Sequence, residues 1–156
     1  MGNDQAGADG VTRIVEVGAK AETDRVAVAE CWLVSTPEAV ENLIAGTKKG
    51  SPLETGKVAG LIGVKRTPDL LPHCHPLRIT GAEVEIEPDA ASGRIRVQTT
   101  VRATDRTGVE MEALTAAAVG ALSLYDTAKA FDRAAHIEGL RLLAKSGGKS
   151  GDYRAG

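Results

Sequence analysis

The stretch GAEVEIEPDAASGRIRVQTTVR, residues 81–102, decides the fold class of this chain. On both sides of a central turn, apolar side chains such as Val84 and Ile86 alternate with charged or polar ones. This period of two predicts strands over 78–87 and 94–103, joined by PDAASG into an antiparallel hairpin. One strand has an acidic outer face and the other a basic one. Cross-strand pairing of opposite charges accounts for that pattern without any function.

Upstream of the hairpin, the sequence predicts one strand and two helices. The valine-rich segment 25–34 is typical of a strand, and STPEAVENLIAG predicts a short helix over 37–45 with a Ser or Thr cap and a Gly stop. The Gly, Pro and Ser content of 47–56 predicts a loop. A second helix, which begins at Lys57 and ends at Pro68, is predicted by the helical spacing of Val58, Leu61, Ile62 and Lys65.

Downstream of the hairpin, we predict a long Ala-rich helix over 109–134, with Leu122 on its apolar stripe, and a final buried strand over 140–144. The resulting order is strand, helix in two parts, strand, strand, helix, strand. It predicts an α+β fold with the ferredoxin-like split βαβ arrangement, in which an antiparallel sheet carries helices on one face. The uncovered sheet face, and a core with few aromatic side chains, favour an oligomer.

Length and composition predict one domain over 13–144, a disordered N-terminus over 1–12 and a flexible Gly/Lys-rich tail over 145–156. The net charge of −2 argues against non-specific nucleic-acid binding. No apolar run is long enough to cross a bilayer, and the polar N-terminus lacks the order of a signal peptide. We therefore expect a cytoplasmic protein whose two cysteines are free thiols.

The segment His73-Cys74-His75 lies between two prolines and permits three interpretations. Imidazoles and a thiol can bind zinc, but adjacent side chains point apart and no second ligand pair follows, so we predict no metal site. A proline-fixed structural turn is the second interpretation. The third is a rigid ligand-binding turn, since prolines lower the cost of holding polar groups in place.

The predicted long helix carries two further candidate groups. Met111 and Glu112 lie at its start, where the helix dipole alone accounts for a carboxylate, although this end can also face a ligand. Asp126 and Lys129 share one face near its end. They suit a surface ion pair, or a partly desolvated lysine whose pKa falls so that it serves as a general acid or base.

The C-terminal KSGGKSGD, residues 145–152, ends like a phosphate-binding P-loop but does not complete one. Leu143 stands where the motif needs a glycine, and too few residues follow for the required helix. What remains is a set of lysines beside Gly and Ser that either serves solubility or binds an anionic ligand such as a polyphosphate: Lys48, Lys49, Lys145 and Lys149.

Four segments resemble the signature segments of cyclic pyranopterin monophosphate synthase, the MoaC family of molybdenum cofactor biosynthesis. They are VEVGAKAETDRVAVAE (15–30), KRTPDLLPHCHPL (65–77), VEMEALTAAAVGALSLYDTAKA (109–130) and LLAKSGGKSGD (142–152). The resemblance spans residues 13–153.

The resemblance implies a lyase that rearranges the cyclised dihydro-GTP intermediate into a pyranopterin, closes a cyclic phosphate and releases diphosphate. It implies a ferredoxin-like protomer in a homohexamer, a trimer of dimers with active sites at subunit interfaces. It implies no cofactor and leaves open whether magnesium accompanies the triphosphate.

The resemblance also assigns roles residue by residue. The positions that match catalytic residues are Asp126, Lys49 and Lys129. The positions that match substrate contacts are His73, Cys74, His75, Met111 and Glu112. The tail lysines that would grip the triphosphate are Lys145 and Lys149. His73 departs from the apolar residue that the family often has before the cysteine, so a backbone contact would survive there more readily than a side-chain contact.

Two interpretations from other classes remain beside the enzyme. A non-catalytic nucleotide-sensing domain of the same fold would need no Asp126 with Lys129, and its ligand would be recovered intact. A metal-binding module would rest on the His-Cys-His segment.

Overall fold

A computed structural model describes residues 10–156. The disorder predicted for residues 1–12 falls mostly on residues 1–9, which lie outside the described part. In chain order the elements are β1 (Thr23–Val34), α1 (Pro37–Ala45), α2 (Pro52–Leu70), β2 (Ile79–Asp89), β3 (Arg94–Asp105), α3 (Glu110–Ala128), β4 (His136–Ser146) and β5 (Tyr153–Arg154). The α+β class is confirmed, and the elements follow the predicted order with β5 added.

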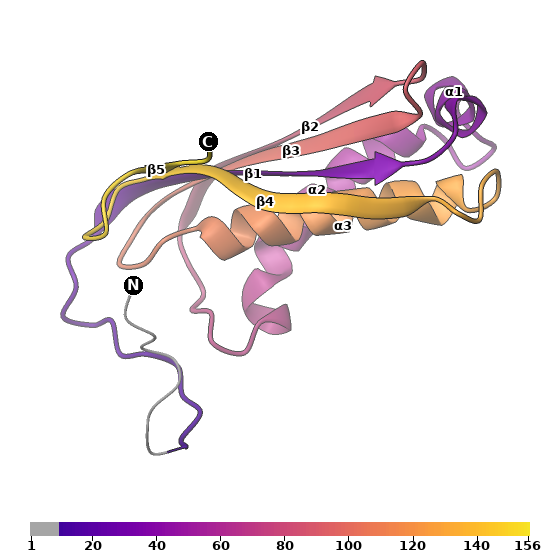
Figure 1. Ribbon diagram of the computed structural model, residues 1–156. Coiled ribbons are helices and arrows are strands. Elements are labelled where there is room, and N and C mark those ends of the chain that lie inside the picture. Colours follow the sequence, from indigo (N-terminus) through magenta and orange to yellow (C-terminus); the bar gives the residue numbers. More distant parts are fainter. Residues whose placement is uncertain (1–9) are drawn as a thin grey trace.

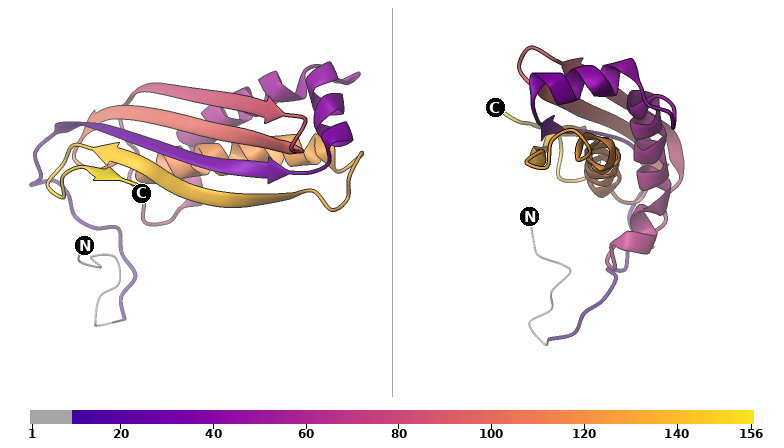
Figure 2. Two further views of the ribbon diagram at one scale, coloured as in Figure 1. Left: turned by 45° about the horizontal axis from the view of Figure 1, so that its top comes forward. Right: turned by 90° about the vertical axis from the view of Figure 1, so that its right-hand side faces the viewer.

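The strands form one sheet in the order β2-β3-β1-β4-β5, and every pair of neighbours is antiparallel. Helices α2 and α3 lie on one face of this sheet, as predicted, and no helix or strand among residues 10–156 covers the other face (Figure 2). The short helix α1 lies at one end of the sheet, beside the tip of the β2–β3 hairpin (Figure 1). The ferredoxin-like assignment itself stays a prediction.

The core lies between the sheet and the two long helices. Alternate residues of β3 point into it and are buried, as the period of two predicts: Ile95, Val97, Thr99 and Val101. The stripe predicted for α3 is wrong at Leu122, which is 55% exposed. Of the other residues of that predicted stripe, Ala121 is buried, and Leu114 and Tyr125 pack against the core. The side chains of α3 that are fully buried are mostly small. The buried residues of α3 include Ala113, Ala117, Gly120, Ala121 and Leu124.

Glycines explain why small residues, and not large apolar ones, mark the buried face of α3. A Cβ on Gly60 of α2 would lie 2.9 Å from Val84 Cγ2 and 3.2 Å from the carbonyl oxygen of Ala116 on α3. A Cβ on Gly63 would lie 3.3 Å from Ala116 Cα. The backbones of α2 and α3 are therefore too close for larger side chains between them.

The loop predicted over 47–56 ends earlier than predicted, because α2 begins at Pro52. Ser51 caps the helix by accepting a hydrogen bond from the Glu54 backbone N–H at 3.2 Å, and Pro52 occupies the first turn. Gly56, which indicated a loop in the sequence, instead packs against Gly120 of α3.

The predicted ends of both long helices are also wrong. Pro68 does not end α2, since a proline disturbs only the turn before it, and the chain continues to Leu70 with the Leu71 N–H donating to the Thr67 carbonyl. Helix α3 ends at Ala128 and not at 134. Asp132 accepts a hydrogen bond from the Ser35 hydroxyl at 2.8 Å, which holds the chain in the turn that leads to β4.

The last strand is longer and more exposed than predicted. It runs over His136–Ser146, where 140–144 was expected, because it pairs along most of β1. Leu140 is exposed on it. Gly139, with φ 68°, lies within one of the two register shifts in this pairing, between Glu138 and Arg141, so it marks an irregularity inside β4 and not its beginning.

The uncovered sheet face is polar, and its charges are paired. Glu30 is buried between Arg96 and Arg141, which donate to its two carboxylate oxygens at 2.7 and 3.0 Å and help hold its pKa below the usual range. Arg94 stacks over Trp32 at 4.9 Å from the ring centroid. The predicted pairing of charges across the hairpin occurs between Arg102 and Glu83, which lie 2.9 Å apart. Arg96 instead pairs with Glu30 of β1.

Candidate active site

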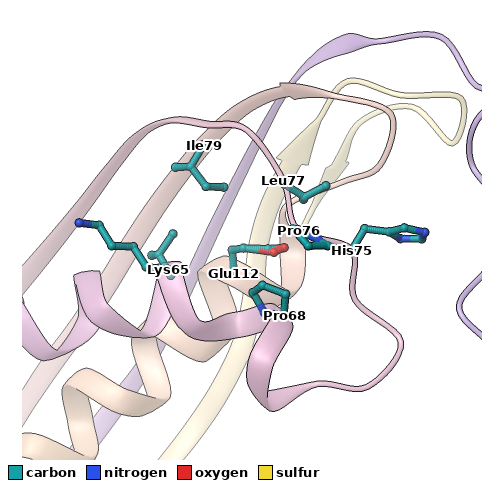
Figure 3. A pocket seen from close by; sticks show the side chains of 8 residues that line it. Lys65, Pro68, His75, Pro76, Leu77, Ile79 and Glu112 are labelled. Carbon is teal, nitrogen blue, oxygen red and sulfur yellow. The ribbon is translucent and has the colours of Figure 1, made fainter.

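A cavity of about 330 Å³ opens where α2 ends and α3 begins. Its lining joins the end of α2, the proline-rich turn after it and the first turn of α3: Val64, Lys65, Pro68, His75, Pro76, Leu77, Ile79 and Glu112. Figure 3 shows the Glu112 carboxylate directed at the gap between Pro68 and Pro76. The Lys65 ammonium and the His75 ring extend outward on opposite sides of it. The predicted contacts His75 and Glu112 therefore share one cavity.

Glu112 is held in an environment that disfavours its charge. The residue is 4% exposed, and its Oε2 has no hydrogen-bond partner among the described residues. Burial raises the pKa of Glu112 to about 7, and the neighbouring charge of Glu110 adds to the rise. A carboxyl with this pKa can take up or release a proton near neutral pH, which suits general acid–base chemistry on a ligand in the cavity.

The turn between Pro72 and Pro76 holds its three candidates in different positions. The Cys74 N–H donates to the Leu71 carbonyl at 3.1 Å, and burial raises the pKa of the Cys74 thiol, with the charge of Glu112 contributing. His73 lies outside the cavity lining, with Nδ1 2.7 Å from the carbonyl oxygen of Arg13. Among residues 10–156, no group of three or more His, Cys, Asp or Glu side chains is placed to hold a metal ion.

Strand β5 and the turn that leads to it lie at the end of the molecule where α3 begins (Figure 1). Lys145 belongs to β4, and its ammonium lies 3.7 Å from Glu110 Oε1 at the start of α3 and donates to the Ser150 hydroxyl. The chain then turns back through Gly147 and Gly148, both with positive φ, so that β5 pairs with β4. Lys149 is exposed in this turn. The flexibility predicted for the tail stays a prediction.

A second group of candidates lies at the opposite end of α3. Lys129 Nζ is 2.8 Å from Asp126 Oδ1, and the two side chains are 55% and 73% exposed. This hydrogen bond lowers the pKa of Asp126, to which Lys49 in the loop before α2 also contributes. The same bond raises the pKa of Lys129, so the fall expected from partial desolvation does not occur in the single chain.

Comparison with known proteins identifies the family of this chain. The model of the MoaC family matches residues 14–148. The chain belongs to the MoaC family.

Relatives of the MoaC family match this chain over nearly its whole length. Proteins named cyclic pyranopterin monophosphate synthase from Methylobacterium sp. and Deinococcus radiodurans are each 50% identical to it. These alignments cover 95% and 94% of this chain and 93% and 86% of the relatives. The protein of the same name from Streptomyces griseus is 49% identical over 93% of this chain and 81% of its own length.

The residues that the MoaC family resemblance singles out form two groups and not one. Glu112 and Asp126 are fourteen residues apart on α3, which at 1.5 Å per residue corresponds to about 21 Å. The cavity residues and tail lysines lie at one end of this helix, and Lys49, Asp126 and Lys129 lie at the other. A single chain therefore does not bring all predicted site residues of this MoaC family member together.

One lining residue was missed as a site candidate. Lys65 was assigned only to the apolar spacing of its helix, together with Val58, Leu61 and Ile62, although a lysine on such a stripe is a signal of its own. The structure places it on the cavity. No helix among residues 10–156 is both long and apolar enough to cross a membrane.

Proposed function

We propose that the chain is a cyclic pyranopterin monophosphate synthase. It would convert the cyclised dihydro-GTP intermediate, 3′,8-cyclo-7,8-dihydroguanosine 5′-triphosphate, to cyclic pyranopterin monophosphate with release of diphosphate, a lyase reaction of molybdenum cofactor biosynthesis. The observation that carries this proposal is that relatives 49–50% identical over more than nine-tenths of the chain bear that name.

The residue types at both ends of α3 suit this chemistry. Opening and reclosing rings moves protons on and off nitrogen and oxygen, a task for Asp126, Lys49 and Lys129 as catalytic groups. His75, Cys74, Met111 and Glu112 contact the substrate, with His73 through its backbone.

Closing the cyclic phosphate forms one bond from oxygen to the α-phosphorus while the bond to the diphosphate breaks. Negative charge then develops on the leaving group, and cations must neutralise it. Lys145 and Lys149 fill this role, with or without magnesium on the triphosphate.

We propose further that the protein acts in the cytoplasm as a homohexamer, a trimer of dimers, with active sites at subunit interfaces. Two observations support sites of this kind. The candidate residues are split between the two ends of α3, and Asp126 and Lys129 are more than half exposed in the single chain. A second subunit would supply the missing half of each site.

The test is an assay of purified protein with the cyclised dihydro-GTP intermediate. Diphosphate and the oxidised pterin product are measured together for wild type and for Lys49→Ala. We expect both products in equal amounts from wild type, and a loss of turnover by at least about a hundredfold in the variant.

The matched control is Lys48→Ala, which removes the neighbouring exposed lysine and should leave turnover near the wild-type value. Intermediate that is bound but recovered unchanged by wild type would contradict the proposal. That result would favour a nucleotide-sensing domain instead.

A further inference from the structure

The chain before β1 forms a segment, residues 13–22, that we call the N-terminal strap. This segment contains no helix or strand, and it lies beside the turn that follows α2 in both views of Figure 2. Val15 and Val17 are partly buried, whereas Ile14, Glu16 and Gly18 are exposed. One side of the strap therefore faces the protein, as expected of a segment that packs onto it.

The base of the strap is anchored by charges. Glu22 lies 2.6 Å from Arg78 Nη2 and 3.9 Å from Arg106 Nη2. Arg106 Nε also donates to the Lys20 carbonyl at 3.2 Å. The backbone N–H groups of both arginine residues donate to the Asp105 carboxylate, each at 2.8 Å, which keeps the two residues together. These contacts fix the place where the strap leaves β1.

The far end of the strap reaches His73 in the proline-rich turn. His73 Nδ1 lies 2.7 Å from the carbonyl oxygen of Arg13. Because a carbonyl oxygen only accepts hydrogen bonds, Nδ1 carries the hydrogen and donates it. His73 is half-buried and lies outside the cavity lining, so its ring serves the strap and not the cavity.

The contacts at His73 and Arg78 bracket one wall of the cavity. The chain between them supplies three residues to the lining: His75, Pro76 and Leu77. Pro72 and Pro76 restrict how this segment bends internally, so its position depends on what holds its two flanks. The strap contacts both flanks, and the wall between them faces the Glu112 carboxylate across the cavity (Figure 3).

We infer that His73 is a positioning residue that ties the N-terminal strap to the cavity wall, and that the closed strap holds His75 in place for a ligand in the cavity. The His73 side chain acts through the strap and the turn and does not itself contact the ligand. What the cavity does in turnover rests on the proposed function, but the contact between His73 and the strap does not.

The first test is limited proteolysis of the full chain with trypsin, which cleaves after Arg13 when the strap opens. His73→Leu removes the donor, and loss of one such hydrogen bond should make cleavage after Arg13 about five times faster. His73→Asn should restore a rate near that of wild type, because its amide nitrogen lies as many bonds from Cα as Nδ1 does. Mass spectrometry of the fragments identifies each cleavage site.

Two controls separate opening of the strap from unfolding. Cleavage after Lys49, in the loop before α2, should have the same rate in wild type and in His73→Leu. His136→Leu removes another histidine that lies near a backbone carbonyl, that of Ala134, but at the end of β4 that pairs with the end of β1. This variant should leave cleavage after Arg13 at the wild-type rate.

Turnover of the cyclised dihydro-GTP intermediate tests whether the strap positions the site. Opening the strap lowers the fraction of chains whose cavity wall is in place. We therefore expect His73→Leu to raise KM about threefold, with a smaller change in kcat. His73→Asn should return KM toward the wild-type value, and His136→Leu should leave it there.

The outcomes distinguish the contact from its role. Equal rates of cleavage after Arg13 in wild type and His73→Leu would overturn the inference. Faster cleavage with an unchanged KM would refute the positioning role, as would a KM that stays raised in His73→Asn although cleavage is again slow. An inactive wild type would refute the proposed function, and the cleavage rates would still decide whether His73 holds the strap.

Discussion

Glu112 is a carboxyl group that the fold holds away from water at the edge of a cavity. Its pKa of about 7 in the folded chain lies above the ordinary value of 4.5. For an acid whose folded pKa is raised, the stabilising contribution is complete below the unfolded pKa and is lost as pH rises through the folded one. The relevant window is therefore between about pH 4.5 and about pH 7.

Glu112→Gln removes this titration while keeping nearly the same shape. We expect the unfolding free energy of wild type to fall, relative to the variant, by on the order of 3 kcal/mol between pH 5 and pH 8. Urea denaturation of both proteins at the two pH values measures the difference. Glu41→Gln, at an exposed position on α1, is the control and should keep the pH dependence of wild type. Parallel pH profiles for wild type and Glu112→Gln would show that the carboxyl is not held as described.

The sequence predicted the candidate site residues one by one. It did not predict that they form two groups at the two ends of α3. Segments that resemble the MoaC family identified Asp126, Lys129 and Glu112 individually. Their separation along one helix follows from the rise per residue alone, so the sequence was sufficient to predict that they lie at opposite ends of this helix. The raised pKa of Glu112 was not, because it depends on how the end of α2 and the proline turn cover the carboxyl.

The close contact between α2 and α3 could not be predicted from the sequence. The alternation in β2 and β3 predicted both strands, because one face of each strand is buried and the other is not. The start of α2 was missed because Gly56 indicated a loop. Gly56 has an ordinary helical conformation, and its backbone lies close to Gly120 of α3. The need for a glycine there comes from this close approach of α3, which the local sequence does not show.

Gly60→Ala tests this contact. An alanine gains up to about 1 kcal/mol in helix propensity, but the new Cβ meets the Ala116 carbonyl oxygen at 3.2 Å, and a backbone oxygen cannot rotate away. We expect overpacking to win, with a net loss of about 1 kcal/mol in unfolding free energy. Urea denaturation measures it, with the exposed Thr55→Ala on the same helix as the control. An unchanged or raised midpoint would show that the helices can separate without cost.

At the scale of the whole molecule, the proposed homohexamer ties stability to protein concentration. Subunit association favours the folded state by mass action, so a tenfold dilution should lower the melting temperature of wild type by a few degrees. Differential scanning fluorimetry over a dilution series measures this shift, and a wild-type melting temperature independent of concentration would contradict the proposed assembly.

The two thiols of the chain lie at different depths. Cys31 is fully buried and donates to the Ala117 carbonyl at 3.2 Å, and burial raises its pKa to about 12, so alkylating reagents do not reach a reactive thiolate there. Cys74 is partly exposed in the turn that leads to the cavity. The native protein thus carries one accessible thiol beside the cavity with Glu112, where a dye attached without any mutation would signal the arrival of a ligand.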